Sequence, residues 1–184
     1  MAEKKLNPLT EIYLQCHEYV KEVKKQESGR YPGKYKRFEK VKIDKYFDTL
    51  SYKAINNLDF ASETMSNLIV IHGLPNTNHR STIVFIGVVL KALDIKFPNY
   101  DIKKNRKKWI SECNRYIRKS KRILYSRKED NNYKEKHLKW TKDWLSDITR
   151  DQSNSSGMMS RKSLTTLKKI SSSLDFSSVI TNKQ

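Results

Sequence analysis

The chain has 184 residues, enough for one domain with a hydrophobic core and a tail. Its 38 Lys and Arg residues against 20 Asp and Glu residues give a formal net charge of +18. Such an excess favours anionic partners such as nucleic acid, nucleotides or acidic proteins, although a solvated basic surface has the same composition. The longest apolar run, "IVFIGVVL" at 83–90, is far shorter than the roughly 20 residues of a membrane span, so we expect no membrane partner.

The first half of the chain predicts two helices separated by a loop. Asn7 and Pro8 are typical of the cap and first residue of a helix, which we expect over 8–26. Two glycines and a proline within 27–41 indicate a loop or short hairpin. A second helix is expected from about Ile43, with an apolar side that reaches Ile55.

Two apolar segments follow, and both are predicted to be helical. Ser62 is the expected cap of a third helix, and Gly73 is its expected C-terminal stop. The next segment, 80–93, is apolar almost all round, which predicts a central helix. Its β-branched residues argue for a strand, but the run continues through "LKAL" without a turn signal, which favours a helix.

The remainder predicts a basic helix, a core helix and a tail. After a break at 97–101, a basic helix is expected to about residue 127, and a last core helix over 133–148. Helical spacing places Trp109, Trp140 and Trp144 in the core, and leaves His17 and His137 as either packed or surface residues. Cys16 and Cys113 fall among apolar neighbours, as expected of reduced thiols in a cytoplasmic protein. No segment alternates as a strand, so the predicted class is all-α.

The division expected from composition has three parts. Residues 1–32 form an N-terminal helix and linker, 33–148 a helical domain, and 149–184 a Ser-rich, mobile tail. Within the tail, the spacing of Leu164, Leu167, Ile170 and Leu174 leaves open a short partner-dependent helix.

The stretch "HGLPNTNHR", 72–80, places polar groups between the two most apolar segments. The N-terminus of a helix offers free N–H groups and a positive dipole end, which together bind phosphate. Arg80 would add a charge-assisted contact and Asn78 an amide or a cap, while His72 would take a proton near neutral pH. A plain turn capped by Asn78 explains the same residues.

This stretch resembles the signature of the Fic/Doc superfamily, His-x-Phe-x-Asp/Glu-Gly-Asn-Gly-Arg, and is closer to the death-on-curing (Doc) branch. Leu74 replaces the aromatic residue, Asn76 the acid, and His79 the lysine of the Doc branch. The segment "GKYKRFEKVKI", 33–43, resembles the flap that precedes the Fic core. The resemblance spans 33–148, but its specific part is the nine-residue stretch.

The resemblance implies a Fic/Doc-type helical bundle that transfers AMP, or phosphate in the toxin–antitoxin Doc branch, from ATP to a hydroxyl of a target protein. His72 would be the general base. The expected nucleotide and phosphate contacts come from Asn76, Thr77, Asn78, His79 and Arg80. The target would pair with a flap around Lys34, Tyr35 and Lys36.

Several positions depart from the family pattern. Asn76 is neutral where the family has an acidic Mg²⁺ ligand, so metal affinity should fall. Thr77 would be strained wherever the turn needs a positive φ. Ile83 replaces a second arginine of many AMP-transferring members, and no glutamate is followed by Gly or Asn, as in the family's inhibitory helix. Restraint would then come from an inhibitory partner protein or another part of the chain.

A second hypothesis concerns the segment 101–128, which has twelve Lys and Arg residues and two acids. A weak or inactive Fic-like protein would bind nucleic acid or an acidic partner through this basic helix. A solvated helix face, or a field that steers ATP toward the loop, remains open as an alternative.

Overall fold

Six α-helices and one short 3-10 helix make up residues 6–50 and 56–149, the part of the chain described by the computed structural model. No β-strand occurs within those ranges, which confirms the all-α class. The elements are α1 (Pro8–Ser28), α2 (Lys40–Thr49), α3 (Asn57–Ile71), α4 (Asn78–Ala92), α5 (Arg106–Tyr125), η1 (Ser126–Lys128) and α6 (Tyr133–Thr149).

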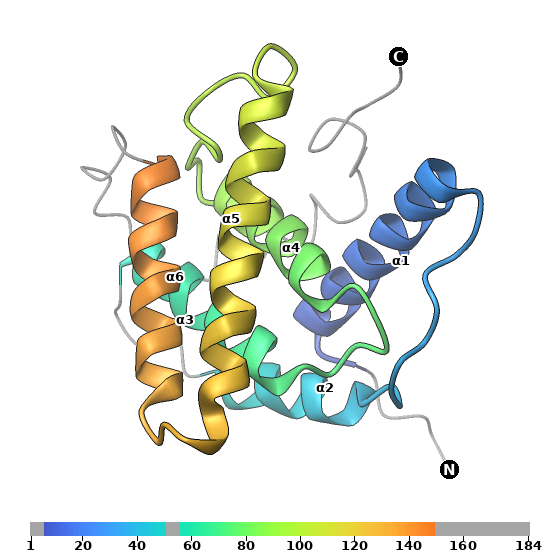
Figure 1. The fold of residues 1–184 in the computed structure, drawn as a ribbon, viewed down its shortest axis with the longest axis vertical. Coiled ribbons are helices and arrows are strands. Elements are labelled where there is room, and N and C mark those ends of the chain that lie inside the picture. Colours follow the sequence, from blue (N-terminus) through green and yellow to red (C-terminus); the bar gives the residue numbers. More distant parts are fainter. Residues whose placement is uncertain (1–5, 51–55, 150–184) are drawn as a thin grey trace.

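Helix α4 is the centre of the bundle. It packs against α1 and α3, while α6 packs on α3 and α5 on α6 (Figure 1). Every side chain of α4 is buried except those of Arg80 and Lys91, which confirms the expected central helix. Because the burial is nearly complete on all sides, α4 holds its first turn in a fixed position relative to the neighbouring helices.

Aromatic side chains fill both halves of the core. Tyr13, Phe47 and Phe85 contact one another where α1, α2 and α4 meet. Trp109 and Trp144 stack between α5 and α6, and both are buried, as the helical spacing predicted. His17 and His137, for which the sequence left packed and surface positions open, are buried, at 3% and 0% exposed.

The starts of α2 and α3 differ from the sequence prediction. The cap of α3 is Asn56, whose side chain accepts from the Asp59 N–H, whereas Ser62 lies inside the helix with its hydroxyl on the Leu58 carbonyl. Helix α2 starts at Lys40, three residues before Ile43, where the sequence predicted its start. Val41 in the first turn of α2 is exposed and does not extend the buried face, so the apolar pattern places this start too late.

The other terminal predictions lie mostly outside the described residues. This holds for Ile55 at the expected end of the second helix and for the Ser-rich tail, of which Thr149 alone is described, as the last residue of α6. Cys16 and Cys113 are free thiols. None of the helices in the described ranges has the length and apolar character needed to cross a bilayer.

Candidate functional site

The connection between α3 and α4, residues 72–77, is a tight turn that we call the α3–α4 loop. It is bounded by two residues in the left-handed region, His72 with φ 52° and Thr77 with φ 51°. The left-handed residue after α3 is therefore His72 and not Gly73, the stop expected from the sequence. Each such non-glycine conformation costs about 1–3 kcal/mol and persists only where the surroundings enforce it.

Asn78 is the residue that closes the loop. Its Oδ1 accepts from the Leu74 N–H at 3.0 Å, and its Nδ2 donates to the Leu74 carbonyl at 2.8 Å. The same Nδ2 also donates to the Tyr35 hydroxyl at 2.8 Å. The side chain is 1% exposed, so its role in this arrangement is to fix the loop and Tyr35.

The segment that precedes α2, residues 30–39, lies along the loop, and we call it the flap. Its backbone donates from Tyr35 to the Pro75 carbonyl at 3.2 Å and from Glu39 to the Gly73 carbonyl at 2.8 Å. It forms no hairpin; the expected target-pairing segment is instead bound to the chain's own loop. Lys34 is exposed and Lys36 lies 3.7 Å from the Glu39 carboxylate.

His72 and Tyr35 form the polar centre of the site. The Tyr35 hydroxyl lies 3.2 Å from His72 Nε2, and the two rings are 5.7 Å apart. Since the Tyr35 oxygen already accepts from Asn78, its own proton is available to Nε2 of a neutral imidazole carrying its proton on Nδ1. A hydroxyl of the protein itself therefore occupies the place in which a general base would hold a substrate hydroxyl.

The charge around His72 is positive. Burial, followed by the charges of Lys36, Arg127 and Lys121, lowers the pKa of His72 to about 4. The imidazole is thus neutral at physiological pH and its Nε2 lone pair is free to accept a proton. A bound anion would offset the three cations and raise this pKa toward neutrality, which would strengthen the base.

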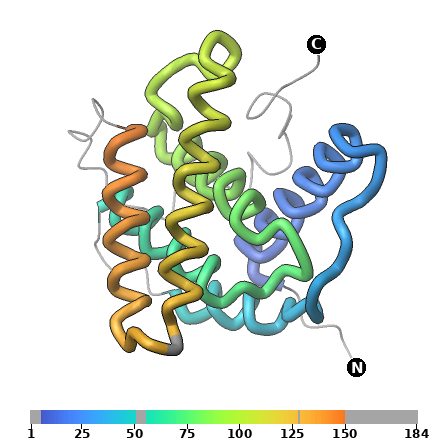
Figure 2. Tube along the Cα trace, in the orientation of Figure 1, coloured from blue at the N-terminus to red at the C-terminus, as the bar shows by residue number. Residues whose placement is uncertain are grey.

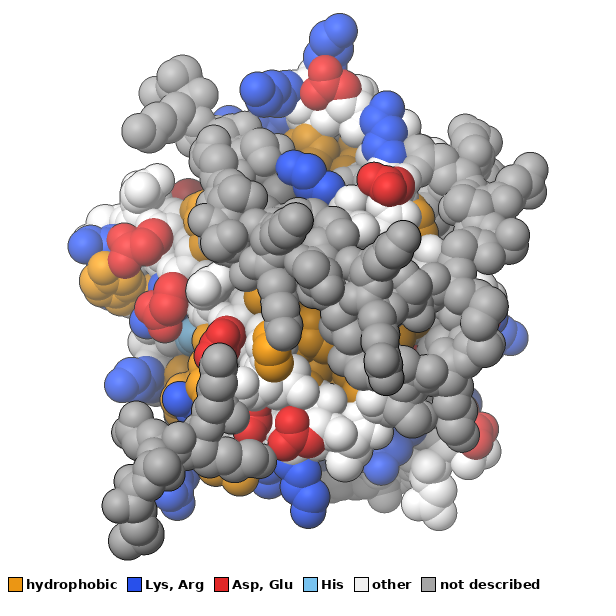
Figure 3. Space-filling model, turned by 180° about the vertical axis from the view of Figure 1, so that it is seen from behind, with side chains coloured by type: hydrophobic (Ala, Val, Ile, Leu, Met, Phe, Trp, Pro, Cys, Tyr) orange, Lys and Arg blue, Asp and Glu red, His pale blue; other side chains and the backbone are white. Residues whose placement is uncertain are grey.

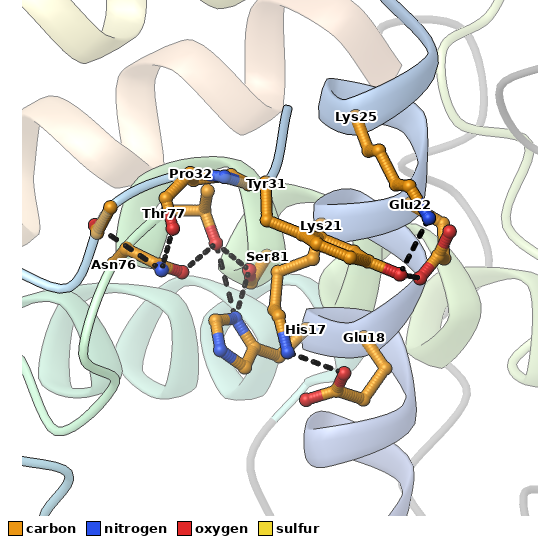
Figure 4. A network of polar contacts seen from close by, with 11 residues as sticks. His17, Glu18, Lys21, Glu22, Lys25, Tyr31, Pro32, Asn76, Thr77 and Ser81 are labelled. Atoms are coloured by element: carbon orange, nitrogen blue, oxygen red, sulfur yellow. Dashed lines mark hydrogen bonds and ion pairs between the residues drawn. The ribbon is translucent and has the colours of Figure 1, made fainter. Parts of the chain in front are cut away.

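Asn76 and Thr77 are tied to the flap and to α1 (Figure 4). Asn76 donates to the Pro32 carbonyl at 3.0 Å and accepts from the Thr77 hydroxyl at 3.3 Å. The Thr77 hydroxyl also lies 3.1 Å from His17 Nδ1 and 3.1 Å from the Ser81 hydroxyl. Burial, the largest cause, lowers the pKa of His17 to about 4, so this histidine is a neutral structural partner of the loop.

The residues present do not fit the expected Mg²⁺ site. Both ends of the Asn76 amide have protein partners and the side chain is 3% exposed. Within the described ranges, no group of three His, Cys, Asp or Glu side chains is placed to hold a metal ion. A hard cation needs several oxygen ligands, and Asn76 alone does not supply them.

The ring of His79 lies in the core and not at the loop surface. Its Nε2 is 2.9 Å from the Ser120 hydroxyl, and it is 7% exposed. The Ser120 hydroxyl is also 2.7 Å from His137 Nε2, and His137 Nδ1 is 2.8 Å from the Ser66 hydroxyl. Only the backbone N–H of His79 remains available to an anion.

The first turn of α4 has the character of an anion site. Thr77 makes no side-chain cap, and no acidic residue lies in the first turn. The N–H groups of Asn78, His79 and Arg80 precede the first intrahelical bond, from Ser81 to Thr77. Arg80 is exposed and forms no ion pair with a carboxylate of the described residues. Its guanidinium is therefore free to add a positive charge beside these donors.

Arg80 also lines a groove of about 310 Å³ between α1, α4 and α5. The walls are mostly apolar, and include Val20, Ile83, Trp109 and Ile117. Residues four apart on a helix lie on the same face, so Lys121 is on the face of α5 that places Ile117 in the groove. The charge of Lys121 contributes to the lowered pKa of His72. The groove thus reaches from Trp109 to Arg80 in the first turn of α4, and His72 is not among the residues that line it.

Sequence reasoning missed several partners of the predicted residues. Four of them lie 40 or more residues away in the sequence: His17, Ser120, Lys121 and Arg127. His17 contacts Thr77 and Ser120 contacts His79. The charges of Lys121 and Arg127 lower the pKa of His72. For Lys121 and Arg127, the sequence offered one indication, namely their position in the predicted basic helix. No signal in the sequence paired either His17 or Ser120 with the loop.

Comparison with protein families matches residues 2–160 to the group described as "Family of unknown function (DUF8172)". The chain belongs to this family. The matched range contains every described element and the whole candidate site of this DUF8172 chain. No curated protein matches it, and no solved structure does. The resemblance to the Fic/Doc superfamily accordingly rests on the residues of the α3–α4 loop.

Proposed function

We propose that this protein is a Fic-like transferase that moves AMP, or phosphate as in the Doc branch, from ATP to a hydroxyl of a target protein. The observation that carries the proposal is the neutral His72, with Nε2 3.2 Å from a tyrosine hydroxyl, next to a first turn of α4 that has free donors and Arg80. A base, an anion site and an unpaired guanidinium are the groups that such a transfer needs.

The proposed step is a displacement at phosphorus. The target hydroxyl would replace the Tyr35 hydroxyl at His72 Nε2, and its oxygen would attack the phosphorus as Nε2 takes the proton. The new O–P bond forms while the bond to the leaving group breaks, releasing pyrophosphate after AMP transfer or ADP after phosphate transfer. The N–H groups of the first turn of α4 and Arg80 would stabilise the phosphoryl charge. No step is assigned to Mg²⁺, since the residues do not fit it.

The groove supports a nucleotide as the donor. Its apolar walls suit a base, and Arg80 lines the groove from the first turn of α4, which follows the loop that holds His72. The cations Lys36, Lys121 and Arg127 would attract the phosphates and, once bound to them, stop lowering the pKa of His72. Nucleotide binding and activation of the base are thereby linked.

The test is incubation of the full chain and a cell lysate with ATP labelled at the α or the γ phosphate. We expect a labelled protein, with α-label indicating AMP transfer and γ-label alone indicating phosphorylation. His72→Ala should lower the labelling rate at least about 100-fold, the usual effect of losing a general base. Arg80→Ala should raise the KM for ATP, whereas Arg115→Ala, an exposed arginine paired with Glu112 on α5, should not.

Two results would contradict the proposal. One is labelling that persists unchanged in His72→Ala, and the other is absence of any labelled protein with either nucleotide. Tyr35→Phe tests whether the Tyr35 hydroxyl competes with the target hydroxyl for His72 Nε2, because it removes that hydroxyl and leaves the imidazole in place. Labelling by Tyr35→Phe should be retained or increased.

A further inference from the structure

The outer face of α5 is a row of cations with few acids to neutralise it. Its inner side buries Trp109, Tyr116 and Ser120. The opposite side exposes Lys107, Arg118, Lys121 and Arg122, which we call the α5 cationic face, and ends at the exposed Tyr125. Uncharged Ser111 and Asn114 lie between Lys107 and Arg118 on this side, so the cationic stripe is densest at the C-terminal end of α5, where Arg118, Lys121 and Arg122 follow one another at helical spacing. The single acid of α5, Glu112, is bonded to Arg115.

The stripe continues onto the flap. The end of α5 and the α3–α4 loop lie toward the same end of the molecule, the lower edge in Figure 2. Lys121, Arg127 and the flap residue Lys36 all act on His72, and Tyr125 acts electrostatically on Tyr35. One surface therefore joins the α5 cationic face, His72 and the flap.

Exposed aromatic rings accompany the cations on this surface. Tyr125 is 80% exposed, and the flap residues Tyr35 and Phe38 are 59% and 41% exposed. A third flap ring, Tyr31, is 48% exposed but packs against Lys25 of α1, whose Nζ lies 4.4 Å from the ring centroid. Rings are seldom left this open without a partner, and alternating cations and open rings suit a polyanion that also carries flat bases. An acidic protein would use the cations but would leave the rings without a matching surface.

The opposite side of the molecule is different. In the part of that side not drawn in grey, Lys and Arg side chains alternate with Asp and Glu side chains (Figure 3). The excess of positive charge is therefore not spread evenly over the described surface. A uniformly basic coat, which would serve solubility alone, does not account for the concentration of cations along α5.

We propose that the α5 cationic face, Tyr125 and the flap aromatics form a binding surface for single-stranded nucleic acid. The phosphates would lie along Lys107, Arg118 and Arg122, and bases would stack on Tyr125 and on the flap rings. Stacking needs bases that are not already stacked within a duplex, which favours a single strand. The proposal does not depend on the transferase reaction, because the phosphate contacts and the Tyr125 ring lie on α5 and take no part in the chemistry of His72.

The experiment is fluorescence anisotropy of the full chain with labelled 16-nucleotide single-stranded RNA and DNA of mixed sequence, across a salt series. Arg118→Glu combined with Arg122→Glu should weaken binding at least about tenfold and make the log–log salt slope shallower by about 1.4, the value for two lost phosphate contacts. The matched control is Lys134→Glu with Lys139→Glu, two exposed lysines of α6 that change the net charge equally. This control should leave binding within about twofold.

A second pair of variants tests stacking. Tyr125→Ala should weaken binding about tenfold, and Tyr125→Phe should restore it, because phenylalanine keeps the ring. Circular dichroism of each variant checks that the helices are intact. The proposal is overturned if both charge-reversal pairs weaken binding equally, if Tyr125→Ala has no effect, or if a duplex of equal length binds as tightly as the single strand. Competition by polyglutamate as effective as that by the oligonucleotide would assign the surface to an acidic protein instead.

Discussion

Gly73 is the residue at which the backbone of the α3–α4 loop comes closest to α2. A Cβ atom built there would lie 2.6 Å from Ile43 Cγ1 and 2.9 Å from Ile43 Cδ1. Ile43 is 0% exposed and has no free volume to move into. The glycine is thus required by a close approach, and the positive φ that the sequence suggested for it falls on His72 instead.

We expect Gly73→Ala to lower the free energy of unfolding by about 1–3 kcal/mol, the usual cost of forcing extra volume into a packed core. Combining it with Ile43→Ala should cost less than the sum of the two single changes, because the second removes the atoms that clash. Urea denaturation of the four proteins measures both effects. Gly33→Ala is the control, since a Cβ at Gly33 meets nothing within 4 Å. If the losses of unfolding free energy for Gly73→Ala and Ile43→Ala simply add in the double variant, the contact between the new Cβ and Ile43 is not the source of the destabilisation.

At the scale of elements, a chain of hydrogen bonds centred on the Ser120 hydroxyl joins four helices. Ser120 of α5 contacts His79 of α4 and His137 of α6, and His137 contacts Ser66 of α3. Burial is the largest cause that lowers the pKa of His79 to about 3 and of His137 to about 4, so both rings are neutral. Each neutral ring has one donor and one acceptor nitrogen, and the serine hydroxyls match them in a consistent chain.

Ser120→Ala should therefore destabilise the protein more than Ser66→Ala. The first change leaves a nitrogen of both His79 and His137 without a partner inside the core, and the second leaves only one nitrogen of His137. At about 1–3 kcal/mol for each buried group left unsatisfied, we expect a loss of at least about 2 kcal/mol for Ser120→Ala. Thermal and urea unfolding measure the difference. Equal losses would mean that water enters to replace the Ser120 hydroxyl.

The same elements indicate what the sequence could predict. Apolar periodicity predicted six helices, and all six are present in the described residues, because burial on one face leaves a period that a single sequence reveals. The start of α3 was wrong: Asn56 caps it and not Ser62, because both residue types are common caps and the apolar pattern does not choose between them. The partner of His79 was not predicted, since Ser120 lies 41 residues away, and such pairings come from packing and not from local pattern.

For the candidate site, the sequence could predict the residues of the loop but not their orientation. Tyr35 was expected in a flap that pairs with the target, and its hydroxyl lies 3.2 Å from His72 Nε2, a contact that the sequence did not predict. Asn76 and Asn78 were expected to face a ligand, whereas their amides bind the flap and the loop. An amide is equally suited to both roles, so its residue type alone does not distinguish a ligand contact from a structural one.

At the scale of the whole molecule, all four histidines respond to acid in the same direction. The pKa is lowered to about 4 for His17, His72 and His137 and to about 3 for His79, in each case chiefly by burial. In the unfolded chain each would titrate near 6.5. Between these limits the unfolded state binds more protons than the folded state, so the free energy of unfolding falls as pH falls from about 6.5 toward 4.

We predict a plateau of stability above about pH 7 and a decline between pH 6.5 and 5, a window in which few carboxylates titrate. A fully buried histidine contributes a slope of up to about 1.4 kcal/mol per pH unit, and the partly exposed His72 contributes less. His137→Gln should lower stability at pH 7, since an amide fits the two serines less well, yet flatten the decline by about one proton. Urea midpoints at pH 7, 6 and 5 for both proteins test this. If the slope is unchanged in His137→Gln, the buried ring is already protonated in the folded protein, and the neutral chain of hydrogen bonds through Ser120 is wrong.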